Sequence, residues 1–107
     1  MSDAKPIVAL KIGRAKYKVR YRRPLPALLG RICYSTRLIV ADDSQDGVEL
    51  ADTLLHEAMH GIWDQRKLGP CVREERAVTE LSGGLVCLFR DNPGLLVHLE
   101  SLIKEAR

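Results

Sequence analysis

The sequence predicts an α+β fold in which a small N-terminal β-sheet is followed by three helices. The first third of the chain alternates apolar and polar residues with the period of two that is typical of strands. The remainder repeats apolar residues at helical spacing. A length of 107 residues fits one domain, so we expect residues 1–107 to form a single unit.

Composition excludes several classes of protein. With 46% hydrophobic and 29% charged residues, the chain has the balance of a globular protein and not of a disordered one. No apolar run approaches the roughly 20 residues of a membrane-spanning helix, and residues 1–6 lack the apolar core of a secretory signal. The three cysteines form an odd set without CxxC spacing, which favours free thiols. We therefore expect a cytoplasmic protein with no membrane partner.

Four short strands are expected in the first third of the chain. They cover residues 7–12, 16–21, 31–33 and 37–41. In the second of them, Tyr17, Val19 and Tyr21 alternate with cations, so apolar and basic side chains occupy opposite faces. The last contains an apolar Leu-Ile-Val run that is typical of an interior strand.

Three helices are expected over residues 48–65, 73–90 and 93–106. Asp46, with Glu49 three positions later, resembles a capping box at the start of the first helix. Asn92 is expected to cap the third helix, with Pro93 at its first position.

Basic residues are concentrated early in the chain. The formal net charge of +3 is too small by itself to imply a nucleic-acid partner. The early cations are Lys11, Arg14, Lys16, Lys18, Arg20, Arg22 and Arg23. The row between Lys16 and Arg23 has two interpretations: it contacts phosphates, or it protects an edge strand from aggregation, which is the commoner use of such a face.

The first expected helix contains the motif His56-Glu57-Ala58-Met59-His60, an HExxH sequence. Residues four apart lie on the same face of a helix, so both imidazoles can bind one Zn²⁺. A zinc ion with an open coordination position lowers the pKa of its bound water to about 7. Glu57 is placed to accept that proton and pass it to a leaving amine. The motif therefore predicts a zinc site with His56 and His60 as ligands and Glu57 as general base.

A third ligand is required. The glycine and third histidine that extend the motif in metzincins are replaced by Trp63 and Arg66, which excludes that class. A carboxylate from the next helix remains, and Glu75 is preferred because it flanks the apolar stripe of that helix beside a possible cleft.

Several other residues stay open as ligands. Glu74 is the main rival because it points more nearly along the stripe. Glu80 lies farther along the same helix, Asp64 lies one turn beyond His60, and Cys71 lies in the connecting loop.

Residues 30–96 resemble a family of small phage and prophage proteins with a minimal zincin domain, similar in pattern to the ImmA/IrrE metallopeptidases. The resemblance is carried by the segments around the HExxH motif (53–62), by 74–78 and 81–85, and by the closing Leu-Phe-Arg-Asp-Asn-Pro of 88–93. It implies a small sheet packed on the active-site helix, with His56, His60 and Glu75 as zinc ligands and Glu57 as general base. Well-known gluzincins place an Asp four residues after the ligand glutamate, where this chain has Thr79.

Two functional hypotheses follow. The first is a zinc-dependent metallopeptidase-like protein of phage or prophage origin that hydrolyses peptide bonds of a protein partner. The alternative is a non-catalytic, zinc-stabilised phage accessory module that binds nucleic acid or a host protein through the basic strand.

Overall fold

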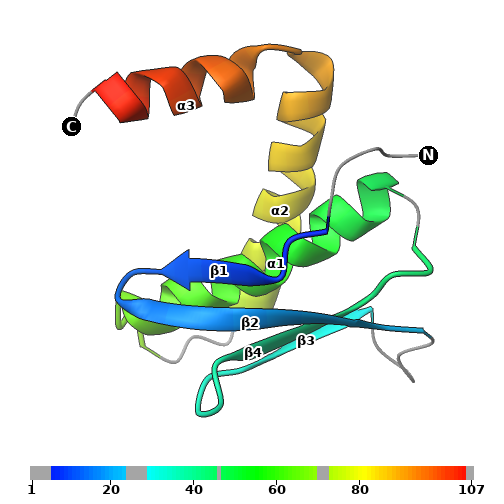
Figure 1. The fold of residues 1–107 in the computed structure, drawn as a ribbon, viewed down its shortest axis with the longest axis vertical. Helices are drawn as coiled ribbons and strands as arrows, with labels where there is room; N and C mark the ends of the chain where they lie inside the picture. The colour runs from blue at the N-terminus through cyan, green and yellow to red at the C-terminus, as the bar shows by residue number, and fades with distance from the viewer. Residues whose placement is uncertain (1–5, 24–28, 46, 70–72, 106–107) are drawn as a thin grey trace.

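Four strands precede three helices in the computed structural model, which describes residues 6–23, 29–45, 47–69 and 73–105 (Figure 1). The elements are β1 (Ala9–Ile12), β2 (Ala15–Arg22), β3 (Gly30–Cys33), β4 (Leu38–Asp42), α1 (Gly47–Gln65), α2 (Glu74–Asp91) and α3 (Leu95–Glu105). The predicted α+β class is confirmed, and each expected element is present close to its expected bounds. The expected capping residue Asp46 lies outside the described residues.

The strands form one sheet in the order β1-β2-β4-β3. β1 and β2 make an antiparallel hairpin, β3 and β4 make another, and β2 runs parallel to β4 at their junction. β2 therefore has a hydrogen-bonded neighbour on each side. The expectation that its cationic row protects an edge strand is wrong, because the edges of the sheet are β1 and β3.

One face of the sheet forms the core against α1. The buried cluster consists of Ile12, Ala15, Tyr17, Val19 and Ile39, with Leu54 and Ala58 of α1 among the residues packed against it. The helix approaches closely at Gly61, where an added Cβ atom would lie 2.7 Å from Cδ1 of Ile12. Glycine at this position thus sets the distance between α1 and the sheet.

The two remaining helices extend the helical layer. α2 packs against α1, whereas α3 projects from the end of α2 and leaves most of its leucines exposed (Figure 1). α3 begins at Leu95, later than expected, because Gly94 with φ of 97° interrupts the helix. The side chain of Asn92 donates to the carbonyl of Leu88 at 2.8 Å and so ends α2, where a cap for α3 was expected. No helix in the described ranges combines the length and apolar character needed to cross a bilayer.

Candidate metal centre

α1 places the HExxH motif between the sheet and α2. Thr53, Glu57 and Gly61 are its buried residues, spaced four apart on the side that meets the sheet. His56 and His60 lie one turn apart, and their side chains are 21% and 12% exposed. The helix therefore points both imidazoles toward α2, while Glu57 lies on the face that meets the sheet.

The first turn of α2 brings Glu75 to both histidines. Its Oε1 lies 2.8 Å from Nε2 of His56, and its Oε2 lies 2.8 Å from Nε2 of His60. The two Nε2 atoms are 3.2 Å apart. One ligand atom from each of these three residues thus lies within 4.8 Å of the others. We call His56, His60 and Glu75 the ligand cluster.

The spacing of the ligand cluster suits a tetrahedral ion. With Zn–N bonds of about 2.0–2.1 Å, two nitrogens at tetrahedral positions lie about 3.3–3.4 Å apart. The observed Nε2–Nε2 separation of 3.2 Å is close to that value. Two imidazoles and one carboxylate are also a donor set that zinc accepts, with a fourth position left open. The two N–O separations of 2.8 Å are shorter than the tetrahedral value, so the Glu75 carboxylate would have to move back slightly to admit an ion. The three side chains could therefore hold a metal ion after this small adjustment.

Glu74 has a separate role that was not expected from the sequence. Its Oε2 lies 2.6 Å from Nδ1 of His60, on the side of the ring opposite the ligand cluster. A carboxylate in this position accepts a hydrogen bond from Nδ1–H and leaves the lone pair of Nε2 free for a metal. In gluzincins an Asp four residues after the ligand performs this kind of task. In this chain the corresponding contact to Nδ1 of His60 comes from Glu74, which immediately precedes Glu75.

The orienting role of Glu74 had a weak signal in the sequence. Two consecutive acidic residues open α2, and neighbouring positions on a helix point about 100° apart. One of them can therefore reach Nε2 of both histidines while the other reaches Nδ1 of His60. This division becomes visible only when the position of α1 relative to α2 is known.

Glu57 is a buried carboxylate next to the ligand cluster. It is 6% exposed. Burial raises the pKa of Glu57 above its usual range, and the nearby imidazoles of His56 and His60 oppose that rise. A carboxyl with a raised pKa holds a proton more readily than an exposed one, which suits a group that accepts and returns protons.

A cleft of about 360 Å³ opens beside Glu57. Its lining includes His56, Glu57 and Glu75, together with Leu29, Gly30, Asp52, Thr53, Thr79 and Ser82. Gly30 begins the edge strand β3, and a Cβ atom there would lie 3.3 Å from Oε2 of Glu57. The cleft is thus bounded by α1, α2 and the start of an edge strand. Oδ1 of Asp52 is buried without a hydrogen-bond partner among the described residues.

A second cavity of about 330 Å³ is lined by Tyr34, Trp63, Asp64, Lys67, Gly69 and Glu74. Burial, and next the charge of Glu74, raise the pKa of Tyr34 to about 12. Its hydroxyl therefore keeps its proton at neutral pH and remains a hydrogen-bond donor. The indole of Trp63 donates to the carbonyl of Gly69 at 2.9 Å, which fixes one wall of this cavity.

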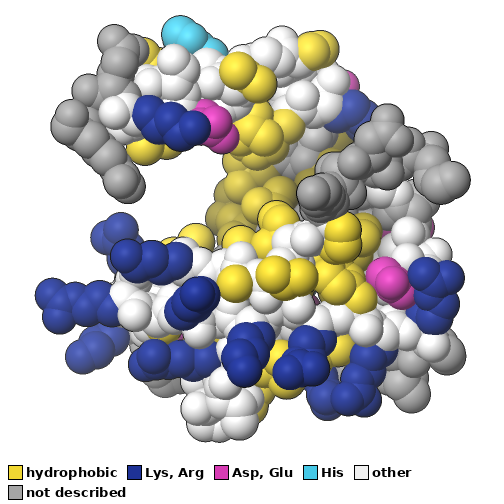
Figure 2. All heavy atoms as spheres, viewed as in Figure 1, with side chains coloured by type: hydrophobic (Ala, Val, Ile, Leu, Met, Phe, Trp, Pro, Cys, Tyr) yellow, Lys and Arg dark blue, Asp and Glu magenta, His cyan; other side chains and the backbone are white. Residues whose placement is uncertain are grey.

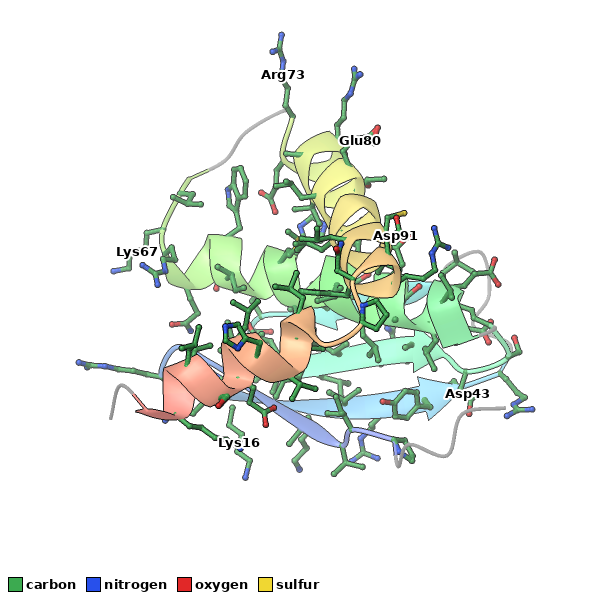
Figure 3. All side chains as sticks on the ribbon, turned by 90° about the horizontal axis from the view of Figure 1, so that it is seen from above. Lys16, Asp43, Lys67, Arg73, Glu80 and Asp91 are labelled. Atoms are coloured by element: carbon green, nitrogen blue, oxygen red, sulfur yellow. The ribbon has the colours of Figure 1, made fainter. Side chains whose placement is uncertain are left out.

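Neither Glu80 nor Asp64 joins the ligand cluster. Glu80 is exposed and points away from α1 (Figure 3). Asp64 lies in the second cavity, and Cys71 lies outside the described residues.

No protein-family model, no curated protein and no solved structure matches the chain. The geometry of the site is therefore the basis for its interpretation.

Proposed function

We propose that this protein is a zinc-dependent metallopeptidase with a minimal zincin-like domain, of phage or prophage origin, acting on a protein partner in the host cytoplasm. The observation that carries the proposal is the convergence of His56, His60 and Glu75, with the buried carboxylate of Glu57 beside them. His56, His60 and Glu75 are the proposed ligands. Glu57 is the proposed general base.

Each residue of the site has a defined task in this mechanism. Bound zinc would supply Lewis acidity and lower the pKa of a coordinated water to about 7. Glu57 takes a proton from the attacking water on a carboxylate oxygen and delivers it to the nitrogen of the leaving amine. Glu74 holds His60 in the tautomer whose Nε2 faces the cluster.

The substrate is proposed to bind as an extended chain along β3. This strand pairs only with β4 in the described sheet, so its other edge is available for backbone hydrogen bonds. Gly30 at its start also lines the cleft. A peptide added to this edge would pass the open side of the site, a mode known as β-augmentation. This placement favours a peptide bond as the reacting group.

The test compares wild type with Glu57→Gln and His56→Ala. Each protein is incubated with a proteome-derived peptide library, new peptide termini are identified by mass spectrometry, and zinc is measured by elemental analysis. We expect about one zinc per wild-type chain and new termini that depend on it. Glu57→Gln keeps the zinc and loses cleavage, because the amide cannot accept the proton. His56→Ala loses both.

Two outcomes would overturn the proposal at different points. A wild-type protein that takes up no zinc refutes the metal centre. A protein that binds zinc but produces the same termini as Glu57→Gln refutes the peptidase activity and leaves a structural metal site.

A further inference from the structure

The face of the sheet turned away from α1 carries a dense group of cations. Lys11 lies opposite Lys16 across β1 and β2, while Arg20 and Arg31 lie on either side of Val40 of β4. Residues paired in this way project from the same face. Six exposed cations, which we call the cationic face, therefore share one surface: Lys11, Lys16, Lys18, Arg20, Arg22 and Arg31. Figure 2 shows Lys and Arg side chains gathered along the sheet.

Acidic side chains of the described residues balance little of this charge. In the part of the chain that the structure describes, no ion pair involves any of the six residues. Asp42 is the acidic residue of the strands and lies opposite Arg22 in the pairing of β2 with β4. It is 7% exposed and accepts hydrogen bonds from the backbone N–H and the hydroxyl of Ser44. Most other acidic residues lie on α1 and α2. Edge protection does not account for the row either, because β2 is an interior strand.

We propose that the cationic face binds the phosphate backbone of duplex nucleic acid. The row from Lys16 to Arg22 spans about 20 Å at 3.3 Å per residue. Duplex DNA carries one negative charge per roughly 1.7 Å of its axis when both strands are counted, so a duplex of this length has about twelve phosphates, and those on the side facing the sheet can contact the row. The cations of β1 and β3 widen the contact to both sides. Release of condensed counterions from the duplex then drives the association.

The distribution of aromatic residues favours a duplex over a single strand. Proteins that hold single strands stack bases on aromatic side chains. Tyr17 is buried and Tyr21 is partly buried in the core on the opposite face. Among the described residues, Tyr34 at the end of β3 is the one exposed tyrosine beside Arg31, so the strands offer no row of aromatic side chains between these cations. Contacts to phosphates alone carry no sequence information. We therefore expect binding with little sequence preference.

The metal centre lies on the helical side of the sheet, so a bound duplex leaves the cleft accessible. The two activities are independent in this arrangement. Nucleic-acid binding does not require cleavage, and it survives if the proposed peptidase activity is refuted.

The test measures fluorescence anisotropy of a labelled DNA duplex of mixed sequence, about 20 base pairs long, between about 50 and about 200 mM NaCl. Wild type is expected to lose at least about 100-fold in affinity over this range, as at least four phosphate contacts require. Lys18→Glu with Arg20→Glu is expected to weaken binding at least about 10-fold at the lower salt and to flatten the salt dependence.

The matched control is Arg66→Glu with Arg73→Glu, which changes the net charge equally. Arg73 lies on the opposite side of the view from Lys16 (Figure 3), and Arg66 and Arg73 belong to the segment that joins α1 to α2 and not to the strands. This control is therefore expected to retain nearly wild-type affinity. Circular dichroism establishes that each variant is folded. Lys16→Gln with Lys18→Gln, which keeps much of each aliphatic stem, replaces the charge reversal if that variant does not fold and is expected to weaken binding in the same direction.

Three results would overturn the proposal. The first is no binding at the lower salt concentration. The second is an equal loss in the face variant and the matched control, which indicates a response to net charge only. The third is tighter binding to single-stranded DNA or to phosphatidylserine vesicles than to the duplex.

Discussion

Two neighbouring acidic residues at the start of α2 have different positions in the site. Glu75 contacts Nε2 of both histidines, while Glu74 contacts Nδ1 of His60. The side chain of Glu75 is 69% exposed, and that of Glu74 is 22% exposed. The exposed carboxylate is therefore the one that an ion could reach in the proposed site, and the more buried one holds the ring of His60 in place.

We expect Glu74→Gln to weaken zinc affinity about 10- to 100-fold without abolishing binding, as for other residues that orient a ligand histidine. The amide still occupies the position but gives a weaker, uncharged contact to Nδ1. Competition with a chromogenic chelator measures the affinity. Glu75→Ala is expected to lose more zinc affinity than Glu74→Gln. Glu80→Gln, which alters an exposed acidic residue on the same helix, is the control and should keep wild-type affinity. Loss in Glu74→Gln as large as in Glu75→Ala would instead make Glu74 a ligand.

Cys33 provides a prediction about pH. Its thiol lies 3.5 Å from Oγ of Ser35. Hydrogen bonds from Ser35 and then Thr36 lower the pKa of Cys33 to about 7. Because the thiolate is the reactive form, alkylation of Cys33 by iodoacetamide should accelerate as pH rises through about 7 and level off above it. Mass spectrometry of the Cys33 peptide gives the rate. Ser35→Ala should move the midpoint to higher pH, and an unchanged midpoint would contradict this origin of the shift.

At the scale of elements, the contact between α1 and the sheet depends on glycine. A Cβ at Gly61 would lie 2.7 Å from Cδ1 of Ile12 and 3.3 Å from Cδ1 of Ile32. Gly84 of α2 is exposed and has no atom within 4 Å of such a Cβ. The two positions share the same helix propensity but differ in available space.

Alanine at each glycine separates these effects. Gly84→Ala should raise the free energy of unfolding by about 0.5–1 kcal/mol, because alanine is the better helix former. Gly61→Ala gains the same propensity but overpacks the core, at a cost of about 1–3 kcal/mol. In urea denaturation, the free energy of unfolding of Gly61→Ala should therefore be at least about 1 kcal/mol lower than that of Gly84→Ala. Equal stabilities would show that the helix is not held at this close distance.

The strands and helices could be predicted because their signals are local. Alternation of Tyr17, Val19 and Tyr21 with cations places β2 correctly, and helical apolar spacing places α1 and α2. The strand order could not be predicted, since the parallel pairing of Val19 with Ile39 joins residues far apart in sequence. The interior position of β2 follows from that order. Without the order, the sequence could not show that the cationic row does not belong to an edge strand.

The part of the site that lies within one helix could be predicted, and the part that joins two helices could not. The spacing of His56 and His60 within one helix predicted their convergence, because that distance depends on helix geometry alone. Which of Glu74 and Glu75 faces both histidines depends on how α2 crosses α1. The spacing of apolar residues along one helix carries no information about that crossing. The contact of Glu74 with the back of His60 lay beyond the sequence for the same reason.

At the scale of the whole molecule, a metal ion would join α1 to α2. The histidines belong to one helix and the third carboxylate to the other. The free energy of metal binding at this point would therefore also stabilise the packing of α1 against α2.

We expect zinc to raise the melting temperature relative to protein in EDTA. At free zinc about 1,000 times its dissociation constant, the gain is about 4 kcal/mol, which corresponds to at least about 15 °C for a domain of this size. Thermal unfolding followed by circular dichroism measures the shift. His56→Ala, which lacks one ligand, should show almost none. A comparable rise in His56→Ala would place the stabilising ion elsewhere.

The single parallel junction in the sheet also has a consequence for the order of folding. β1 with β2 and β3 with β4 are each contiguous hairpins, which can close early because their loops are short. The β2–β4 junction pairs residues that are farther apart in the sequence, such as Val19 with Ile39, so its closure costs more chain entropy and we expect it to form after the hairpins. Docking of two preformed hairpins is thus the step that we expect to complete the sheet, and substitutions at the β2–β4 junction are expected to slow folding more than substitutions in either hairpin loop.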